Sequence, residues 1–165
     1  MSLPCSALRA RVLRMTRPAR GYVQWLAACS LGLAGCGASQ LAWSDAVPAT
    51  RDQAQAYEER YLTLLDDFER HECAVHVALG RGETQVSYAV EPGWCYAFLA
   101  VGDVGVVDLD MALLDADGRQ LASDSMFDAT PFVQQCADRA STWQVILRVV
   151  RGSGDATLGV QRKPD

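Results

Sequence analysis

Carboxylates grouped in one stretch of the chain are the first residues whose types and spacing suggest chemistry. Asp108 and Asp110 alternate with apolar residues, so both side chains fall on one face of a strand, and Asp115 and Asp117 follow closely. Such oxygen ligands suit Ca²⁺, but the register of an EF-hand loop fails because Leu113 stands where its first ligand would be. The simpler interpretation is a polar outer face ending in a hairpin turn, and we favour no metal site here.

His71 and His76 are the second candidate pair. They are five positions apart, whereas the zinc-protease helix needs a spacing of four. Five positions turn the rings away from each other on a helix and onto opposite faces of a strand. Since the chain has only 2 histidines, a His-rich zinc site is disfavoured.

The remaining catalytic patterns are incomplete. Ser153 lies between two glycines, which is a turn composition, and no Gly-x-Ser-x-Gly elbow is present. No glycine-rich loop leads from a strand into a helix, so nucleotide binding has no support. Asp108 and Asp110 could serve acid–base chemistry only inside a cleft that raised one pKa. We therefore expect no enzyme activity, and a secreted hydrolase is the least favoured class.

The first 35 residues have the layout of a secretory signal. Residues 1–20 carry arginines and no acidic residue, and an apolar run covers 25–34. The run ends in Leu33-Ala34-Gly35-Cys36, which resembles the lipobox of bacterial lipoproteins. The resemblance implies cleavage before Cys36, fatty acyl chains such as palmitate on this cysteine, and a lipid-anchored envelope protein. Gly37 after the cysteine favours the outer membrane.

Two other interpretations of this segment remain open. An uncleaved membrane anchor is the second choice because the apolar stretch is marginal for crossing about 30 Å of hydrocarbon. The other interpretation is an ordinary cleaved signal without lipid, but this segment lacks the Ala-x-Ala triplet that usually marks such a cleavage site. Met15 is a possible true start, since it leaves a shorter leader with two arginines before the apolar run.

The charge balance changes when residues 1–35 are removed. The whole chain has 15 basic and 20 acidic residues and a net charge of -5. Every acidic residue lies beyond the leader, so the remaining part carries 10 basic and 20 acidic residues, a net charge of -10. Nucleic acid is therefore not an expected partner, because binding phosphates requires a basic surface.

Three cysteines remain beyond Cys36, and export favours their oxidation. Cys95 and Cys136 both fall in the strand-rich region, and joining them would close a loop of roughly 40 residues, worth about 4 kcal/mol on a chain-entropy model. We predict this disulfide. Cys73 is then a buried single cysteine or an intermolecular bridge.

Hydrophobic periodicity divides the chain beyond residue 35 into three parts. Residues 36–49 are rich in small residues and predict a flexible tether. The region 50–72 predicts one amphipathic helix, with a capping box of Thr50 and Gln53 and apolar residues at helical intervals from 51 to 70. From 73 to 165 the period is two, in runs beginning near residues 75, 86, 94, 107, 143 and 156 with glycine-rich turns between them. The chain is therefore mainly β, and we expect an antiparallel jelly-roll-like β-sandwich preceded by the helix.

The stretch from residue 94 to 160 resembles the bacterial pre-peptidase C-terminal (PPC) domain, a jelly-roll-like β-sandwich often attached to secreted peptidases. The resemblance rests on Cys95-Tyr96, the run from Val107 to Asp115, Gly118, Asp124, Pro131, Cys136, Trp143-Gln144-Val145 and Gly152-Ser153-Gly154. The chain departs from the family at Ser141-Thr142-Trp143, where Gly-x-Tyr is common. Some relatives bind Ca²⁺, and no peptidase fits in the remaining residues.

Two functional hypotheses follow. The first is a non-enzymatic, lipid-anchored module whose sandwich binds a protein or glycan partner in the envelope. The second is a structural or assembly subunit of an envelope complex that associates through the helix and Cys73. The sequence names neither the ligand nor a cofactor.

Overall fold

The computed structural model of the 165-residue chain describes residues 39–43, 46–65, 67–70, 74–80 and 82–165. The predicted signal peptide with Met15, the lipidation site Cys36, and the residues His71 and Cys73 lie outside the described residues.

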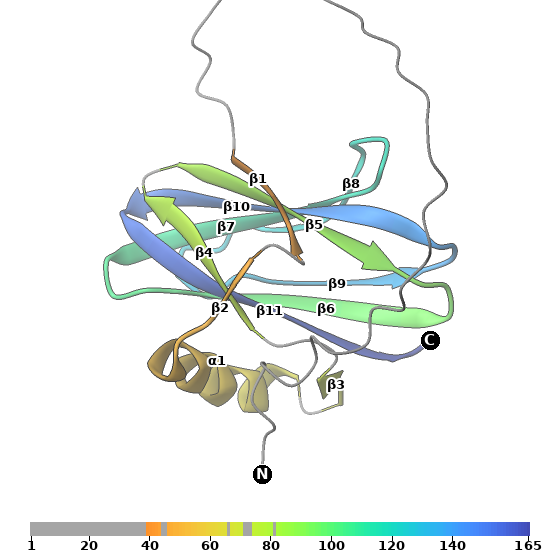
Figure 1. Cartoon of the computed structure of the whole chain (residues 1–165), viewed down its shortest axis with the longest axis horizontal. Coiled ribbons are helices and arrows are strands. Elements are labelled where there is room, and N and C mark those ends of the chain that lie inside the picture. Colours follow the sequence, from red (N-terminus) through yellow and green to blue (C-terminus); the bar gives the residue numbers. More distant parts are fainter. Residues whose placement is uncertain (1–38, 44–45, 66, 71–73, 81) are drawn as a thin grey trace, which may run out of the picture. The chain divides into compact units, whose positions relative to one another are not determined.

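Two β-sheets face each other (Figure 1). One sheet, here sheet A, has the strand order β1-β5-β10-β7-β8, and the other, sheet B, has the order β2-β4-β11-β6-β9. The strands of sheet A are β1 (Ser39–Ala42), β5 (Glu83–Val90), β7 (Val106–Leu114), β8 (Gln120–Asp124) and β10 (Ser141–Gly152). Those of sheet B are β2 (Val47–Pro48), β4 (Val75–Gly80), β6 (Trp94–Gly102), β9 (Phe132–Ala137) and β11 (Gly154–Pro164), with β3 (Glu69–Arg70) paired to β11.

The eight strands β4 to β11 divide four and four between the sheets, as in a jelly roll, which confirms the predicted fold class. Their pairings are antiparallel, whereas the short β1 pairs with β5 in parallel. Only β7 and β8 form a hairpin between consecutive strands; the other connections from β4 to β11 pass from one sheet to the other. The glycine-rich segment between β10 and β11 is therefore a corner between sheets.

The core lies between the sheets and consists of the inward residues of the period-two runs. An aromatic cluster fills one part of it, in which Tyr96 lies edge-on to Trp143 with ring centroids 5.8 Å apart, and Tyr88 lies edge-on to Phe98 at 5.6 Å. These four side chains are at most 5% exposed. Aromatic edge-to-face pairs add to the free energy gained from burial, so this cluster stabilises the contact between the sheets.

The helix α1 spans Arg51–Leu64 and begins with the predicted capping box, in which the Thr50 hydroxyl accepts from the Gln53 N–H and the Gln53 side chain accepts from the Thr50 N–H. It ends earlier than the predicted range 51–70, and β3 (Glu69–Arg70) occupies the end of that range. The apolar periodicity continued past the helix because Phe68, beyond its end, is also buried.

Helix α1 lies against sheet B, at the bottom of Figure 1. Tyr57 is 1% exposed and its hydroxyl is hydrogen-bonded to the side-chain amide of Gln161 on β11. The ring passes over Gly159, where a Cβ atom would overlap it. Leu62 on the same helix is 70% exposed, so the apolar face of the helix is only partly covered.

The predicted tether, residues 36–49, is partly structured. Within it, β1 pairs with β5 and β2 pairs with β4. Strands of two to four residues are too short to show a period-two pattern, so they could not be predicted from the sequence. No helix in the described part of the chain is long and apolar enough to cross a membrane.

Candidate functional site

The four weak calcium candidates do not gather around one point. Asp110 accepts a hydrogen bond from Arg148 at 2.8 Å, and this contact raises the pKa of the guanidinium. Asp115 is engaged in the turn after β7, and the Asp117 backbone N–H donates to it. Among the described residues, no cluster of three metal-ligand atoms includes any of Asp108, Asp110, Asp115 or Asp117.

Asp108 was expected on a polar outer face, but it is buried, at 8% exposure. Its Oδ1 atom has no hydrogen-bond partner among the described residues. The pairing of β7 with β10 is irregular here, and Val106 takes the buried position while Val107, expected to point inward, is 46% exposed. Irregular pairing reorients side chains in this way, and the sequence pattern cannot reveal it.

The predicted turn at Asp117 is the hairpin between β7 and β8. The Asp115 carboxylate accepts hydrogen bonds from the backbone N–H groups of Asp117 and Arg119, at 3.0 and 2.9 Å. The Arg119 Nε atom donates to the other carboxylate oxygen at 3.1 Å. These contacts, the Arg119 backbone N–H foremost, lower the pKa of Asp115. The carboxylate therefore fixes the shape of the hairpin in its ionised form.

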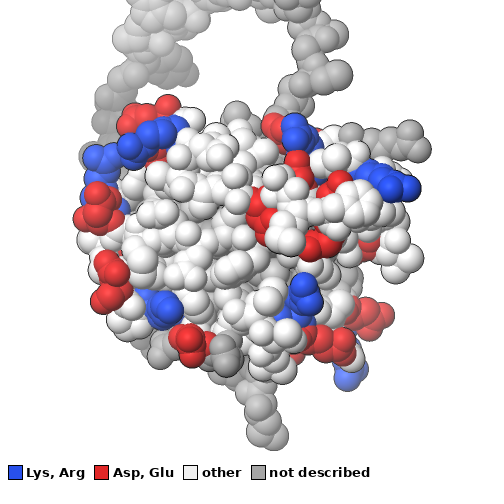
Figure 2. Space-filling view, turned by 180° about the vertical axis from the view of Figure 1, so that it is seen from behind, with Lys and Arg blue, Asp and Glu red and all other residues white. Residues whose placement is uncertain are grey.

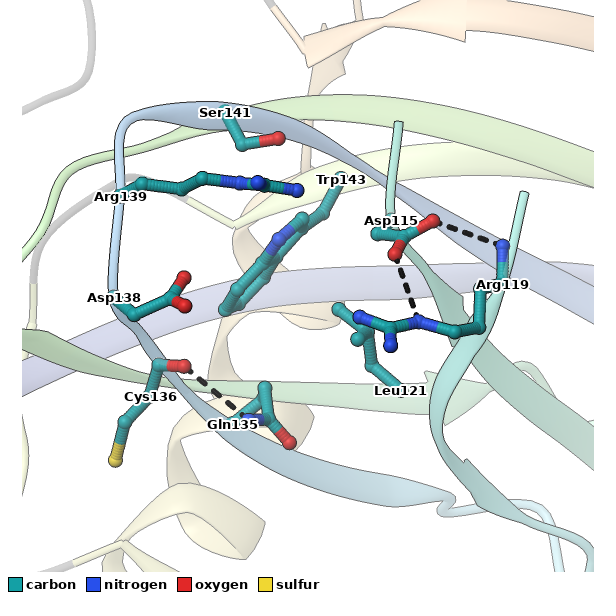
Figure 3. A pocket seen from close by; sticks show the side chains of 9 residues that line it. All are labelled: Asp115, Arg119, Leu121, Gln135, Cys136, Asp138, Arg139, Ser141 and Trp143. Atoms are coloured by element: carbon teal, nitrogen blue, oxygen red, sulfur yellow. Dashed lines mark hydrogen bonds and ion pairs between the residues drawn. The ribbon is translucent and has the colours of Figure 1, made fainter. Parts of the chain in front are cut away.

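A pocket of about 310 Å³ lies beside this hairpin. Its lining comes from the hairpin, from β9, from the turn between β9 and β10, and from the start of β10. Figure 3 shows Trp143 between Arg139 and Asp138 on one side and Asp115 and Arg119 on the other. The pocket thus combines an aromatic side chain with two cations and two anions.

The wall formed by β9 is held by the Cys95–Cys136 disulfide. The two residues face each other in the register of β6 and β9, which supports the predicted pairing. On the opposite wall, Trp143 is 5% exposed and packs on Tyr96. The disulfide, the aromatic contact and the hairpin bonds together make the walls of the pocket rigid.

The two arginines have hydrogen-bond donors to spare. The ion pair of Arg119 with Asp115 uses Nε, and its terminal nitrogens have no hydrogen-bond partner among the described residues. In the described part of the chain, Arg139 forms no ion pair, and Asp138 beside it accepts no hydrogen bond. Planar guanidinium groups of this kind bind carboxylates through two parallel hydrogen bonds. The lining residues include no histidine, and Ser141 has no neighbouring base to activate it.

The other sequence candidates lie elsewhere. Ser153 is at the corner between β10 and β11, where its N–H donates to the Gly105 carbonyl at 3.0 Å. His76 is on β4 and contacts Asp155. Both are at the far end of β10 and β11 from the pocket. Sequence reasoning missed Arg119 and Arg139 because an arginine next to a turn carries no signal of its own.

Charged side chains of both signs lie around the margin of the face in Figure 2, with uncharged side chains between them. Acidic side chains gather toward the right of this view. This face has no continuous basic surface of the kind that nucleic acid requires.

No family model matches the chain, and no curated protein matches its sequence. Among solved structures, the chain is similar to one described as the crystal structure of Aeromonas hydrophila PliG, a periplasmic lysozyme inhibitor of g-type lysozyme. The TM-score is 0.45 at 7% identity, over 77% of this chain and 100% of that chain. We draw no functional conclusion from a likeness of this size.

Proposed function

We propose that this chain is a non-enzymatic binding module of the bacterial envelope, anchored by lipid on Cys36, that holds a partner at the Trp143 pocket. The observation that carries the proposal is the combination of fixed pocket walls with exposed arginine donors that the described residues do not use. The disulfide and the hairpin fix the pocket, while Arg119 and Arg139 offer guanidinium nitrogens without hydrogen-bond partners in the described chain.

The chemistry of the pocket favours a protein partner that presents a carboxylate. Arginine and tryptophan are enriched among residues that contribute most to protein interfaces, and a fixed wall lowers the entropy lost on binding. Asp138, beside Arg139, would select for a partner that also carries a hydrogen-bond donor. A glycan, the other partner class that fits an envelope protein, is an outcome that the experiment below distinguishes.

The alternative of an assembly subunit has weaker support. It required the apolar face of the helix to receive a partner, but Tyr57 on that face is buried against sheet B. Leu62 and Leu64 remain exposed, and a few exposed leucines are ordinary for a protein surface. The resemblance to PPC domains stays a prediction.

Photo-crosslinking in the native cell tests the binding proposal. A photoreactive residue replaces Asp138 at the pocket or, as a control, the fully exposed Val104 at the other end of the sandwich. We expect a discrete protein adduct from position 138 only, lost when Arg119→Ala and Arg139→Ala are combined. Equal adducts from both positions, or an adduct that survives the arginine changes, would refute the pocket as the binding site. A carbohydrate adduct would replace the protein partner with a glycan.

The anchor is tested separately. Cys36→Ala should release the protein from the membrane fraction, because several acyl chains are needed for stable attachment. Metabolic labelling with a palmitate analogue should mark the wild type and not Cys36→Ala. Unlabelled wild-type protein that still fractionates with membranes would contradict the lipoprotein proposal and leave the pocket proposal intact.

A further inference from the structure

His76, Asp103 and Asp155 come together at the end of the sandwich away from the Trp143 pocket. One ligand atom from each, a ring nitrogen and two carboxylate oxygens, lies within 4.8 Å of the others. The three residues come from β4, from the connection between β6 and β7, and from β11. All three are half-buried. The three residues are far apart in the sequence, so no local motif marks the group.

Backbone hydrogen bonds hold the main chain of Asp103 and the carboxylate of Asp155 in place. The Asp103 N–H donates to the Asp155 carbonyl at 2.8 Å, and the Leu79 N–H donates to the Asp155 Oδ1 atom at 3.1 Å. The neighbouring connection is close-packed as well, because a Cβ on Gly105 would overlap the Ser153 carbonyl oxygen. A group of ligands fixed by backbone contacts loses little entropy when it binds an ion.

No lysine or arginine among the described residues neutralises the two carboxylates, and Asp155 contacts only His76 in this way. In the described part of the chain, the Asp103 carboxylate has no hydrogen-bond partner. Two carboxylates held this close repel each other unless a cation lies between them. A divalent ion would supply that cation.

The geometry indicates which kind of ion fits. His76 Nε2 lies 3.3 Å from Asp155 Oδ2, which is long for an N–H···O hydrogen bond. Zinc bonds of about 2.0–2.1 Å in tetrahedral geometry separate neighbouring ligand atoms by roughly 3.3 Å. Imidazole nitrogen with carboxylate oxygen suits zinc and related transition metals, whereas Ca²⁺ takes oxygen ligands. We propose that His76 Nε2 and one oxygen each of Asp103 and Asp155 bind a divalent transition-metal ion of the zinc class, with water completing the coordination.

Gln53 connects this site to the start of helix α1. Its Oε1 atom accepts from the Thr50 N–H at 2.9 Å, so its Nε2 atom faces His76 Nδ1, also at 2.9 Å. Since an amide nitrogen only donates, Nδ1 is the acceptor in this contact. A metal bound at Nε2 would leave the ring's N–H at Nδ1, so Gln53 would have to turn its amide and give up the Thr50 contact. A glutamate at position 53 could accept from both groups at once.

This site goes beyond the proposed function and can fail independently of it, since it shares no residue with the Trp143 pocket. The test uses the full chain in detergent, stripped with a chelator and titrated with Zn²⁺ or Ca²⁺ in competition with a chromophoric chelator. The variants are His76→Gln, Asp103→Asn and Asp155→Asn. Asp117→Asn is the matched control, because Asp117 is an exposed aspartate outside the group.

We expect one Zn²⁺ per chain and no competition by Ca²⁺. Each of the three ligand variants should weaken Zn²⁺ binding by about tenfold or more, while Asp117→Asn leaves it unchanged. Gln53→Glu should tighten binding by about tenfold, because the carboxylate accepts the Nδ1 proton and keeps the Thr50 contact. Equal Zn²⁺ affinity in the ligand variants and the wild type, or weaker binding in Gln53→Glu, would overturn the proposal.

Discussion

The buried hydrogen bond between Tyr57 and Gln161 determines how firmly the helix is attached to the sandwich. Gln161 is 0% exposed, its amide nitrogen donates to the Tyr57 hydroxyl, and its Oε1 atom has no hydrogen-bond partner among the described residues. Tyr57→Phe keeps the ring over Gly159 and removes only the hydroxyl. The Gln161 amide is then left buried with no hydrogen bond from this residue.

The cost follows from the asymmetry of buried polar groups. Leaving one partner unsatisfied costs about 1–3 kcal/mol, whereas replacing both partners with apolar groups of similar shape is nearly neutral. Tyr57→Phe should therefore lower the free energy of unfolding by about 2 kcal/mol. Gln161→Met should cost less, because it also removes the partnerless Oε1 atom. The double variant should be more stable than Tyr57→Phe alone.

Urea unfolding of the wild type, the two single variants and the double variant gives the coupling energy. We expect the double variant to lose about 1–2 kcal/mol less free energy of unfolding than the sum of the two single losses. Leu62→Ala on the same helix is the control, and as an exposed side chain it should stay within about 0.5 kcal/mol of the wild type. Additive single effects, or a Tyr57→Phe variant as stable as the control, would refute the docking of the helix through this bond.

Three further predictions concern the sandwich. Gly159→Ala should lower stability by about 1–3 kcal/mol in urea unfolding, because its Cβ overlaps the Tyr57 ring, and the loss should disappear in a Tyr57→Ala background. The Asp115 pKa is lowered in the folded protein, so its ionised form adds stability that is present above its ordinary pKa of about 4 and is lost as pH falls through the folded value. The stability difference between wild type and Asp115→Asn should thus shrink from pH 6 to pH 3, and a constant difference would contradict the hairpin role. Replacing Cys95 and Cys136 by alanine should cost about 2–4 kcal/mol, and reductant should then lower the wild-type urea midpoint and leave the double variant unaffected.

The strands with long period-two patterns could be predicted from the sequence, and the others could not. β10 spans Ser141–Gly152 and alternates strictly over most of its length, so its inward face was evident. β8 contains no fully buried residue, and β1 and β2 are too short to alternate visibly. Patterns of alternation also say nothing about which strand pairs with which, because most connections here cross between sheets.

The candidate site shows the same division. Cys95 and Cys136 could be paired because both fall in the strand-rich region, but only the register of β6 and β9 places them opposite each other. Arg119 and Arg139 line the same pocket because two separate turns end on the same side of the sandwich. Asp108 was expected at the surface, and the irregular pairing of β7 places it inside. Long-range register, which no local pattern encodes, determined each of these positions.

The pairing of β1 with β5 has a consequence for how the protein would stand on a lipid surface. Ser39 pairs with Thr84 near the beginning of β5, and the pocket lies near the opposite end of that strand. If Cys36 carries the lipid, the three residues up to Ser39 span at most about 11 Å, so the domain would be held close to the bilayer rather than swinging on a long tether. The end with the first strand would face the membrane, and the six residues from Thr84 to Val90, roughly 20 Å of strand, would raise the pocket away from it. The orientation of the module would then present its pocket to partners in the aqueous space beyond the headgroups.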